Sequence, residues 1–150
     1  MSLVNVRNAK ITDANAIQVL YQELVNNPAV SVLPERIAEI EKNVNSSLFV
    51  GEKDGEVVGT VLVSLCLDVM FGYQPFAVVE NIIVTASCRG LGVGTELMRA
   101  VEQYSNSAHC SKIMLLSSAE RVEAHDFFEN VGFIGSSKKG FVKYRRHFTV

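Results

Sequence analysis

One stretch, residues 77–104, constrains the fold most, because a glycine-rich loop joins a strand-like run to a helix-like run. Residues 77–84 are mostly β-branched or apolar, which is typical of a strand buried on both faces. The loop that follows contains Arg89-Gly90-Leu91-Gly92-Val93-Gly94-Thr95. Beyond it, apolar residues recur at the spacing of an amphipathic helix, at Leu97, Met98, Val101 and Tyr104. This order predicts a strand, a tight loop and a helix in direct succession.

A glycine-rich loop that opens a helix is suited to holding phosphate. The first N–H groups of the helix have no partner and lie at the positive end of the helix dipole. Glycines let the backbone approach a ligand closely. The dinucleotide fingerprint fails, because its sixth position would be Thr95 or Leu97. No P-loop motif occurs in the chain either. The loop therefore predicts a phosphate site of another kind, with a plain helix entrance as the alternative.

Length and composition set the broad class. The chain has 150 residues, of which 48% are hydrophobic and 20% charged, so we expect one globular domain over residues 1–150. A net charge of −2 does not suggest a nucleic-acid partner. No apolar run is long enough for a membrane span, and the N-terminus lacks a signal-peptide core. We expect a soluble cytoplasmic protein without a membrane partner.

Cysteine and histidine spacing does not indicate a metal site. Cys66, Cys88 and Cys110 are odd in number and show no C-x-x-C pattern, which argues against a disulfide framework and against zinc. We expect no metal cofactor.

The remaining elements are read from periodicity and turn residues. Together they predict an α/β layered sheet, with hairpins early and late in the chain. The expected strands and hairpins are Val4–Arg7, a hairpin of Leu48–Glu52 and Val57–Leu67 around Asp54-Gly55, Lys112–Leu116, and a final hairpin of Phe133–Ser136 and Phe141–His147. The expected helices are one capped by Asp13, one from Pro34 with Ile37, Ile40 and Val44 on its apolar face, and one carrying Ala124, Phe127, Phe128 and Val131.

The central stretch resembles the acyl-CoA signature of the GCN5-related N-acetyltransferases (GNAT). The strand Val79–Val84 precedes a loop in which Arg89, Gly92 and Gly94 match the family pattern Gln/Arg-x-x-Gly-x-Gly/Ala. Further on, Lys112–Leu116 and the segment Arg121–Phe133 are similar to the later strand and helix of the family and to their Gly-Phe ending. The resemblance implies a mixed, mostly antiparallel twisted sheet flanked by helices, with acetyl-CoA as cosubstrate.

The resemblance also assigns residues to the cofactor. It implies that the strand backbone holds the pantetheine arm, that the loop amides hold the pyrophosphate, and that Arg89 lies near the rim, although Arg89 could be a simple surface charge. Arg121 and Phe128 stand where the family often has an asparagine and a tyrosine. The predicted cofactor-binding residues are Ile82, Ile83, Val84, Arg89, Gly90, Leu91, Gly92, Val93, Gly94, Thr95, Arg121 and Phe128.

Glu80 is the candidate general base. Strict alternation along the strand predicts that it shares a face with Val78, Ile82 and Val84. A carboxylate among apolar neighbours gives up its proton less readily than one in water, which suits a base that works near neutral pH. The family often has a glutamate at this distance before the loop. An ion-paired strand glutamate is the alternative.

Phe128 departs from the family, because it lacks the hydroxyl that would protonate the leaving thiolate. Ser117, Ser118 or water could substitute, but Ser117 and Glu120 also form a capping-box pattern. A thiolate can leave without an acid, so Phe128 does not exclude activity but leaves the general acid unassigned.

Together these residues predict an acetyl-CoA-dependent N-acetyltransferase that acts on a small-molecule primary amine by direct transfer in a ternary complex. An amino sugar, an amino acid and a polyamine are all compatible substrates. An acyl-CoA-binding module without turnover and a lysine or N-terminal protein acetyltransferase are the alternatives. The sequence is also compatible with a homodimer.

Overall fold

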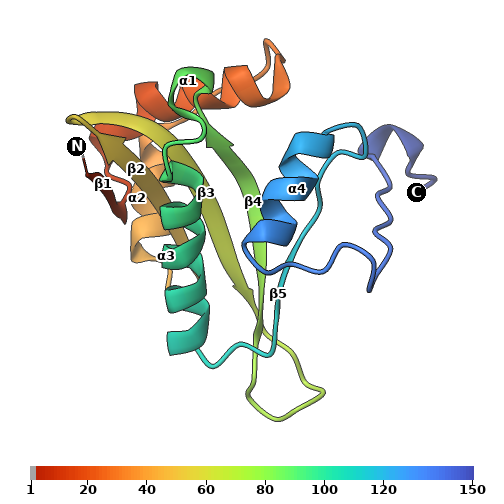
Figure 1. The fold of residues 1–150 in the computed structure, drawn as a ribbon. Helices are drawn as coiled ribbons and strands as arrows, with labels where there is room; N and C mark the ends of the chain where they lie inside the picture. The colour runs from red at the N-terminus through yellow and green to blue at the C-terminus, as the bar shows by residue number, and fades with distance from the viewer. Residues whose placement is uncertain (1–2) are drawn as a thin grey trace. The chain divides into compact units, whose positions relative to one another are not determined.

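The computed structural model describes residues 3–150 and consists of two compact units that divide between Leu115 and Leu116. The first unit contains most of the regular structure (Figure 1). In chain order its elements are β1 (Val4–Asn8), α1 (Ala14–Val25), α2 (Pro34–Lys42), β2 (Ser46–Lys53), β3 (Glu56–Cys66), β4 (Phe76–Val84), α3 (Val93–Ser107) and β5 (Ile113–Leu115). Short 3₁₀ turns precede α1 and follow β4, at Ile11–Asp13 and Ala86–Cys88.

The five strands form one sheet in the order β1-β2-β3-β4-β5. The pairs β1/β2, β2/β3 and β3/β4 are antiparallel, and β5 pairs with β4 in parallel. This architecture confirms the predicted α/β fold with a mostly antiparallel sheet. The predicted hairpin is also confirmed, because Asp54 and Gly55 have φ angles of 53° and 79°, and a type I′ turn requires positive φ at both positions.

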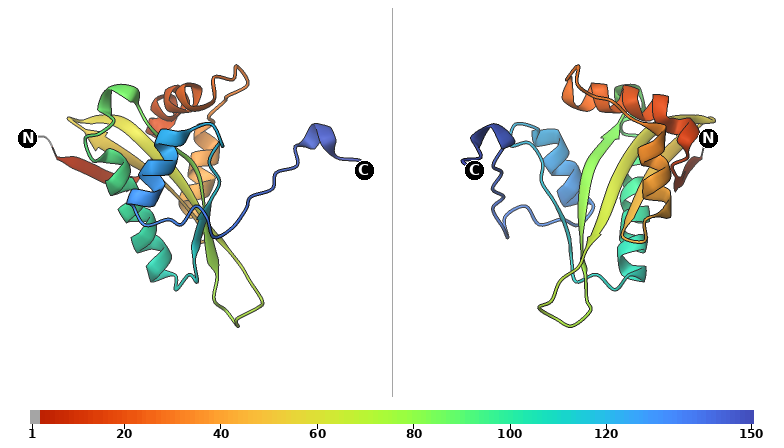
Figure 2. Two further views of the ribbon diagram at one scale, coloured as in Figure 1. Left: turned by 45° about the vertical axis from the view of Figure 1, so that its right-hand side comes forward. Right: turned by 180° about the vertical axis from the view of Figure 1, so that it is seen from behind.

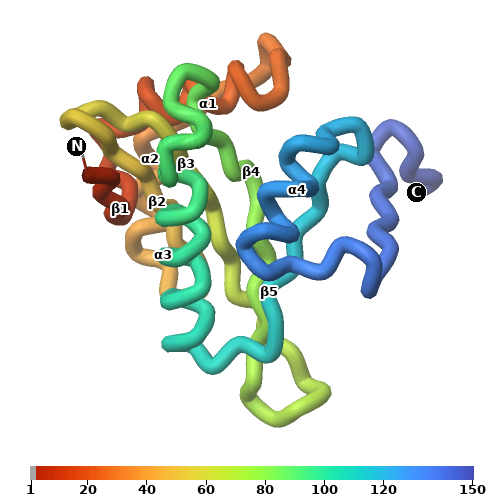
Figure 3. The backbone as a smooth tube through the Cα atoms, in the orientation of Figure 1, coloured from red at the N-terminus to blue at the C-terminus, as the bar shows by residue number. Residues whose placement is uncertain are grey.

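Helices cover both faces of this sheet (Figure 2). On one face, Val50 is fully buried in a cluster with Ile17 of α1 and Ile37 of α2. On the other face, glycines of β2 and β3 let α3 approach the sheet closely (Figure 3). A Cβ added at Gly51 or at Gly59 would lie 3.0 or 3.1 Å from the side chain of Val93, so a larger residue would push α3 away.

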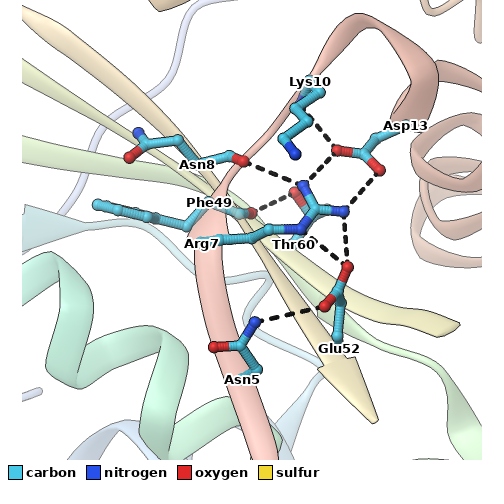
Figure 4. Close-up of polar contacts among 8 residues, drawn as sticks. All are labelled: Asn5, Arg7, Asn8, Lys10, Asp13, Phe49, Glu52 and Thr60. Carbon is cyan, nitrogen blue, oxygen red and sulfur yellow. Dashed lines mark hydrogen bonds and ion pairs between the residues drawn. The ribbon is translucent and has the colours of Figure 1, made fainter. Parts of the chain in front are cut away.

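The start of α1 differs from the expectation (Figure 4). Asp13 is the N-cap residue, but its side chain makes no capping bond to the helix. Both of its carboxylate oxygens instead accept hydrogen bonds from the guanidinium of Arg7, at 2.8 and 3.0 Å, and one also accepts the Lys10 backbone N–H at 2.7 Å. Arg7 donates to Glu52 as well, at 2.8 Å. The bidentate ion pair of Arg7 and Asp13 takes the place of a capping hydrogen bond. Together with Glu52 it links β1 to α1 and β2.

The second helix is shorter than its apolar pattern suggested. It ends at Lys42, and Val44 beyond it is 85% exposed, so the expectation that Val44 belongs to the buried face is wrong.

A β-bulge interrupts β4 beside the predicted base. Leu62 of β3 pairs with Glu80, whereas Thr60, two residues earlier, pairs with Ile83, so three residues of β4 span two of β3. Asn81, in the bulge, has a φ angle of 56°. Asparagine adopts this left-handed conformation more readily than most residues.

The bulge changes which side chains share a face. Glu80 keeps the face of Val78, because their partners Leu62 and Ser64 are two residues apart on β3. Val84 pairs with Gly59 and therefore lies on the α3 face. The expectation that Glu80 and Val84 lie on one side is wrong, since the extra residue reverses the alternation.

The second unit contains α4 (Val122–Asn130) and a 3₁₀ turn at Arg145–His147. Phe128 is buried here, with ring centroids 5.4 Å from Phe127 and 6.0 Å from Phe133. Within residues 116–150, all of which the structure describes, no strand forms, so the predicted hairpin of Phe133–Ser136 and Phe141–His147 is wrong. A lone two-stranded hairpin is marginal in water.

The predicted capping box at Ser117 is also wrong. The N-cap of α4 is Arg121, and the Ser117 hydroxyl is buried without a hydrogen-bond partner.

Candidate functional site

The edge of β4 is open where the bulge begins. β5 pairs with β4 only from Ala77 to Val79. Within the described residues 3–150, no strand pairs with β4 beyond Val79 on that side. The peptide groups of the segment from Glu80 to Val84 that point away from β3 therefore have no ladder partner. Such an edge can accept an extended ligand in the place of a strand.

Glu80 itself is exposed, and so is Asn81. The expectation of a carboxylate enclosed among apolar strand neighbours is therefore wrong. Glu80 pairs with Leu62, so its side chain lies on the same side of the sheet as α1 and α2. There it is open to solvent, next to the open edge of β4.

The N-terminus of α3 lies at the end of this edge and loop. Gly92 is the N-cap residue with a φ of 89°, and Gly90 has a φ of 76°. No atom lies within 4 Å of a Cβ added at either glycine, so space is open above both. The Glu96 N–H donates to the carbonyl of Gly92, at 3.0 Å, so the N–H groups just before it lack an intrahelical acceptor. This arrangement fits an anionic group.

Arg89 is held against the loop rather than free. Its Nε donates to the carbonyl of Val84 at 3.0 Å, and its Nη2 lies 3.6 Å from Oε1 of Glu23, on α1. The Glu23 carboxylate also accepts the backbone N–H of Ala86, at 2.8 Å, and the hydroxyl of Thr85, at 3.0 Å. Glu23 thus ties α1 to the segment that connects β4 to the glycine loop.

A pocket of about 490 Å³ lies against the α1–α2 face of the sheet. Tyr21 and Asn81 supply polar groups to its lining, and their side chains are hydrogen-bonded to each other. Burial raises the pKa of the Tyr21 phenol above its ordinary value, so the hydroxyl stays protonated at neutral pH. Leu62, the ladder partner of Glu80, also lines the pocket.

The first unit brings together most of the predicted site. Glu80 and the segment Ile82–Val84 lie on the open edge of β4, and residues 89–95 form the loop and the first turn of α3. Arg121 and Phe128 belong to the second unit, where Arg121 is the N-cap residue of α4 and Phe128 lies in its last turn. There, His125 Nε2 lies 2.8 Å from the carbonyl of Ser118.

Three residues of this site were missed by the sequence reasoning. Asn81 carried a signal, since an asparagine within a β-branched strand indicates a bulge. Tyr21 could not be told from the apolar stripe of its helix, and Glu23 showed no signal.

The described residues 3–150 contain no group of three or more His, Cys, Asp or Glu side chains arranged to hold a metal ion. Among the helices of that same range, none is both long and apolar enough to cross a membrane.

The model of the acetyltransferase (GNAT) family matches residues 17–133. An uncharacterized N-acetyltransferase of Methanocaldococcus jannaschii is 30% identical over 129 residues, which are 85% of this chain and 76% of that protein. A solved structure of a candidate acetyltransferase from Agrobacterium tumefaciens strain C58 is 26% identical, with a TM-score of 0.85 over 94% of this chain and 99% of that one. Aminoglycoside N-acetyltransferase AAC(6′)-Iy, solved in complex with CoA, is 22% identical, with a TM-score of 0.81 over 97% of each chain, and at that identity it shows a shared fold alone.

Proposed function

This chain belongs to the acetyltransferase (GNAT) family, and we propose that it transfers the acetyl group of acetyl-CoA to a primary amine of a small molecule, by direct attack in a ternary complex. One observation carries the proposal. The unpaired edge of β4 runs from Glu80 to Val84 and is followed by the exposed N-terminus of α3, so a strand edge, an anion site and a carboxylate occur in one short segment.

The residues present fit the two parts of CoA. The peptide groups of Ile82, Ile83 and Val84 would hold the pantetheine arm as an added strand would be held. The amides of residues 90–95 would receive the diphosphate at the start of α3, where the two glycines leave open space. Arg89 would lie at the rim of that site, oriented by Glu23.

Glu80 is proposed as the general base. The amine nitrogen attacks the thioester carbonyl carbon, and its proton passes to Glu80 directly or through water. The C–S bond breaks, and the thiolate leaves. An N–H group of the open β4 edge would stabilise the charge that develops on the carbonyl oxygen. The exposed position of Glu80 supports transfer through water.

Phe128 cannot donate a proton, so we propose that water protonates the leaving thiolate. A thiol with a pKa of about 8.5 is a good leaving group without a positioned acid. Arg121, the N-cap residue of α4, and Phe128 stay proposed cofactor residues because of the family resemblance. A single catalytic domain over residues 1–150, a cytoplasmic location and a homodimer are further parts of this proposal.

The test is amine-dependent thiol release by the full chain. Acetyl-CoA is mixed with the protein and a panel of primary amines, free CoA thiol is followed, and the N-acetylated product is identified by mass. We expect release that depends on both protein and amine. Binding of CoA in calorimetry without amine-dependent release would contradict the proposal and favour a binding module without turnover.

A further inference from the structure

We propose that the acceptor is a primary monoamine with an apolar body, an alkyl or aromatic amine, whose body occupies the pocket between α1, α2 and the sheet. This inference rests on the proposed function and adds the substrate class. It also separates this chain from a polycation acetyltransferase, such as one that acts on aminoglycosides.

The lining of the pocket is largely apolar. Side chains from α1, from the loop after it, from α2 and from the sheet contribute Ile17, Leu24, Val32, Ile37, Leu48 and Leu62. The uncharged polar residues of the lining are Tyr21, Ser31 and Asn81. The hydroxyl of Tyr21 and the amide of Asn81 are hydrogen-bonded to each other, which satisfies part of their polar capacity.

The charge of the pocket argues against polycations. Arg36 is the charged residue of the lining, and neither Asp nor Glu lines it. Arg36 is paired with Glu39 at 3.1 Å, and both of these side chains are well exposed. A polyamine or an aminoglycoside would place several ammonium groups in a space without a carboxylate, and burying an unpaired charge is costly.

The position of the pocket suits a single reacting amine. Leu62 lies in the lining and is the ladder partner of Glu80, and Asn81 connects the lining to the bulge. An amine whose body fills the pocket would therefore present its one nitrogen near the Glu80 carboxylate. A volume of about 490 Å³ lies within the usual range for small-molecule sites.

The first experiment compares acceptors with the full chain and acetyl-CoA, by thiol release. Propylamine, butylamine, hexylamine and 2-phenylethylamine are compared with spermidine and kanamycin. We expect kcat/KM to rise about fourfold for each added methylene until the pocket is filled. Spermidine and kanamycin should fall at least tenfold below hexylamine.

The outcomes separate the two proposals. A higher kcat/KM for spermidine or kanamycin than for hexylamine would overturn the substrate class, while acetyl transfer stands. A kcat/KM that does not change with the length of the alkylamine would do the same. No thiol release with any amine would overturn the proposed function, and this inference with it.

A matched pair of variants tests the pocket directly. Leu33 lines the pocket and is 55% exposed, whereas Leu67 lies outside it and is 81% exposed, so both positions tolerate a charge. Leu33→Glu adds a carboxylate to the pocket, which favours the polyamine. The ratio of the kcat/KM for hexylamine to the kcat/KM for spermidine should therefore fall about fivefold. Leu67→Glu should leave this ratio unchanged. An equal ratio in both variants would overturn the placement of the acceptor.

Discussion

The carboxylate of Glu23 on α1 and the guanidinium of Arg89 in the glycine loop lie 3.6 Å apart, and the same carboxylate accepts the backbone N–H of Ala86 at 2.8 Å. These contacts join residues more than sixty positions apart in the chain. Because the loop leads into the N-terminus of α3, a helix on one face of the sheet helps to position the proposed diphosphate site on the other.

Replacing Glu23 should therefore weaken CoA binding. In Glu23→Ala the segment after β4 loses its hydrogen bonds to α1, and Arg89 loses its charged partner. We expect the Kd for CoA to rise about tenfold, which corresponds to about 1.4 kcal/mol. Calorimetry measures the change. The control is Glu41→Ala, an exposed glutamate of α2, which should bind CoA as the unaltered chain does. Equal affinity in both variants would contradict the role of Glu23.

Glu80→Gln tests the general base. The amide has almost the same shape but cannot accept the proton of the amine, so kcat should fall by about 10²-fold or more. The Kd for CoA should stay nearly the same, because the proposed cofactor contacts come from backbone groups. Glu102→Gln, on the exposed side of α3, is the control. An unchanged kcat in Glu80→Gln would remove Glu80 from the mechanism.

Local signals predicted much of the fold. The Asp54-Gly55 dipeptide indicated its hairpin correctly, because a type I′ turn needs positive φ at two adjacent residues and few dipeptides adopt this conformation readily. The order of strand, glycine loop and helix was also correct, since each of its parts carries its own periodicity. What strict alternation could not predict was the bulge at Asn81, which reverses the faces after Glu80.

Other features depend on partners distant in the sequence. The pocket forms only when α1 and α2 pack on the sheet, so no local pattern marks it. The side chain of Asp13 follows Arg7 rather than its own helix, and no spacing rule chooses between a cap and an ion pair. For Phe141–His147, strand-like residues were not sufficient, because a strand also needs a paired edge.

Gly92→Glu should abolish CoA binding. Gly92 has a φ of 89°, and the new carboxylate would occupy the open space at the helix N-terminus and repel a diphosphate. The matched control is Gly55→Glu, at a turn with a φ of 79° and equally open space. Both variants should lose about 1–2 kcal/mol of stability, because a side chain in the left-handed region is strained. Calorimetry should then show binding by Gly55→Glu only. Loss of binding in both would attribute the effect to stability and contradict the site.

The ion pair of Arg7 and Asp13 should make the free energy of unfolding depend on pH in the acidic range. Hydrogen bonds from Arg7, followed by the backbone N–H of Lys10, hold the pKa of the Asp13 carboxyl below its ordinary value. A carboxyl with a depressed pKa stabilises the fold at a pH above its unfolded value of about 3.9 and loses this contribution as the pH falls through the folded value. Asp13→Asn should therefore cost about 2 kcal/mol at pH 7, as expected for hydrogen bonds to a charged group. The difference in the free energy of unfolding between the two proteins should shrink as the pH falls below about 4.

Denaturant unfolding across this pH range measures the difference, with Asp126→Asn, at an exposed position, as the control. A difference that does not change with pH would mean that Asp13 acts through its shape rather than its charge.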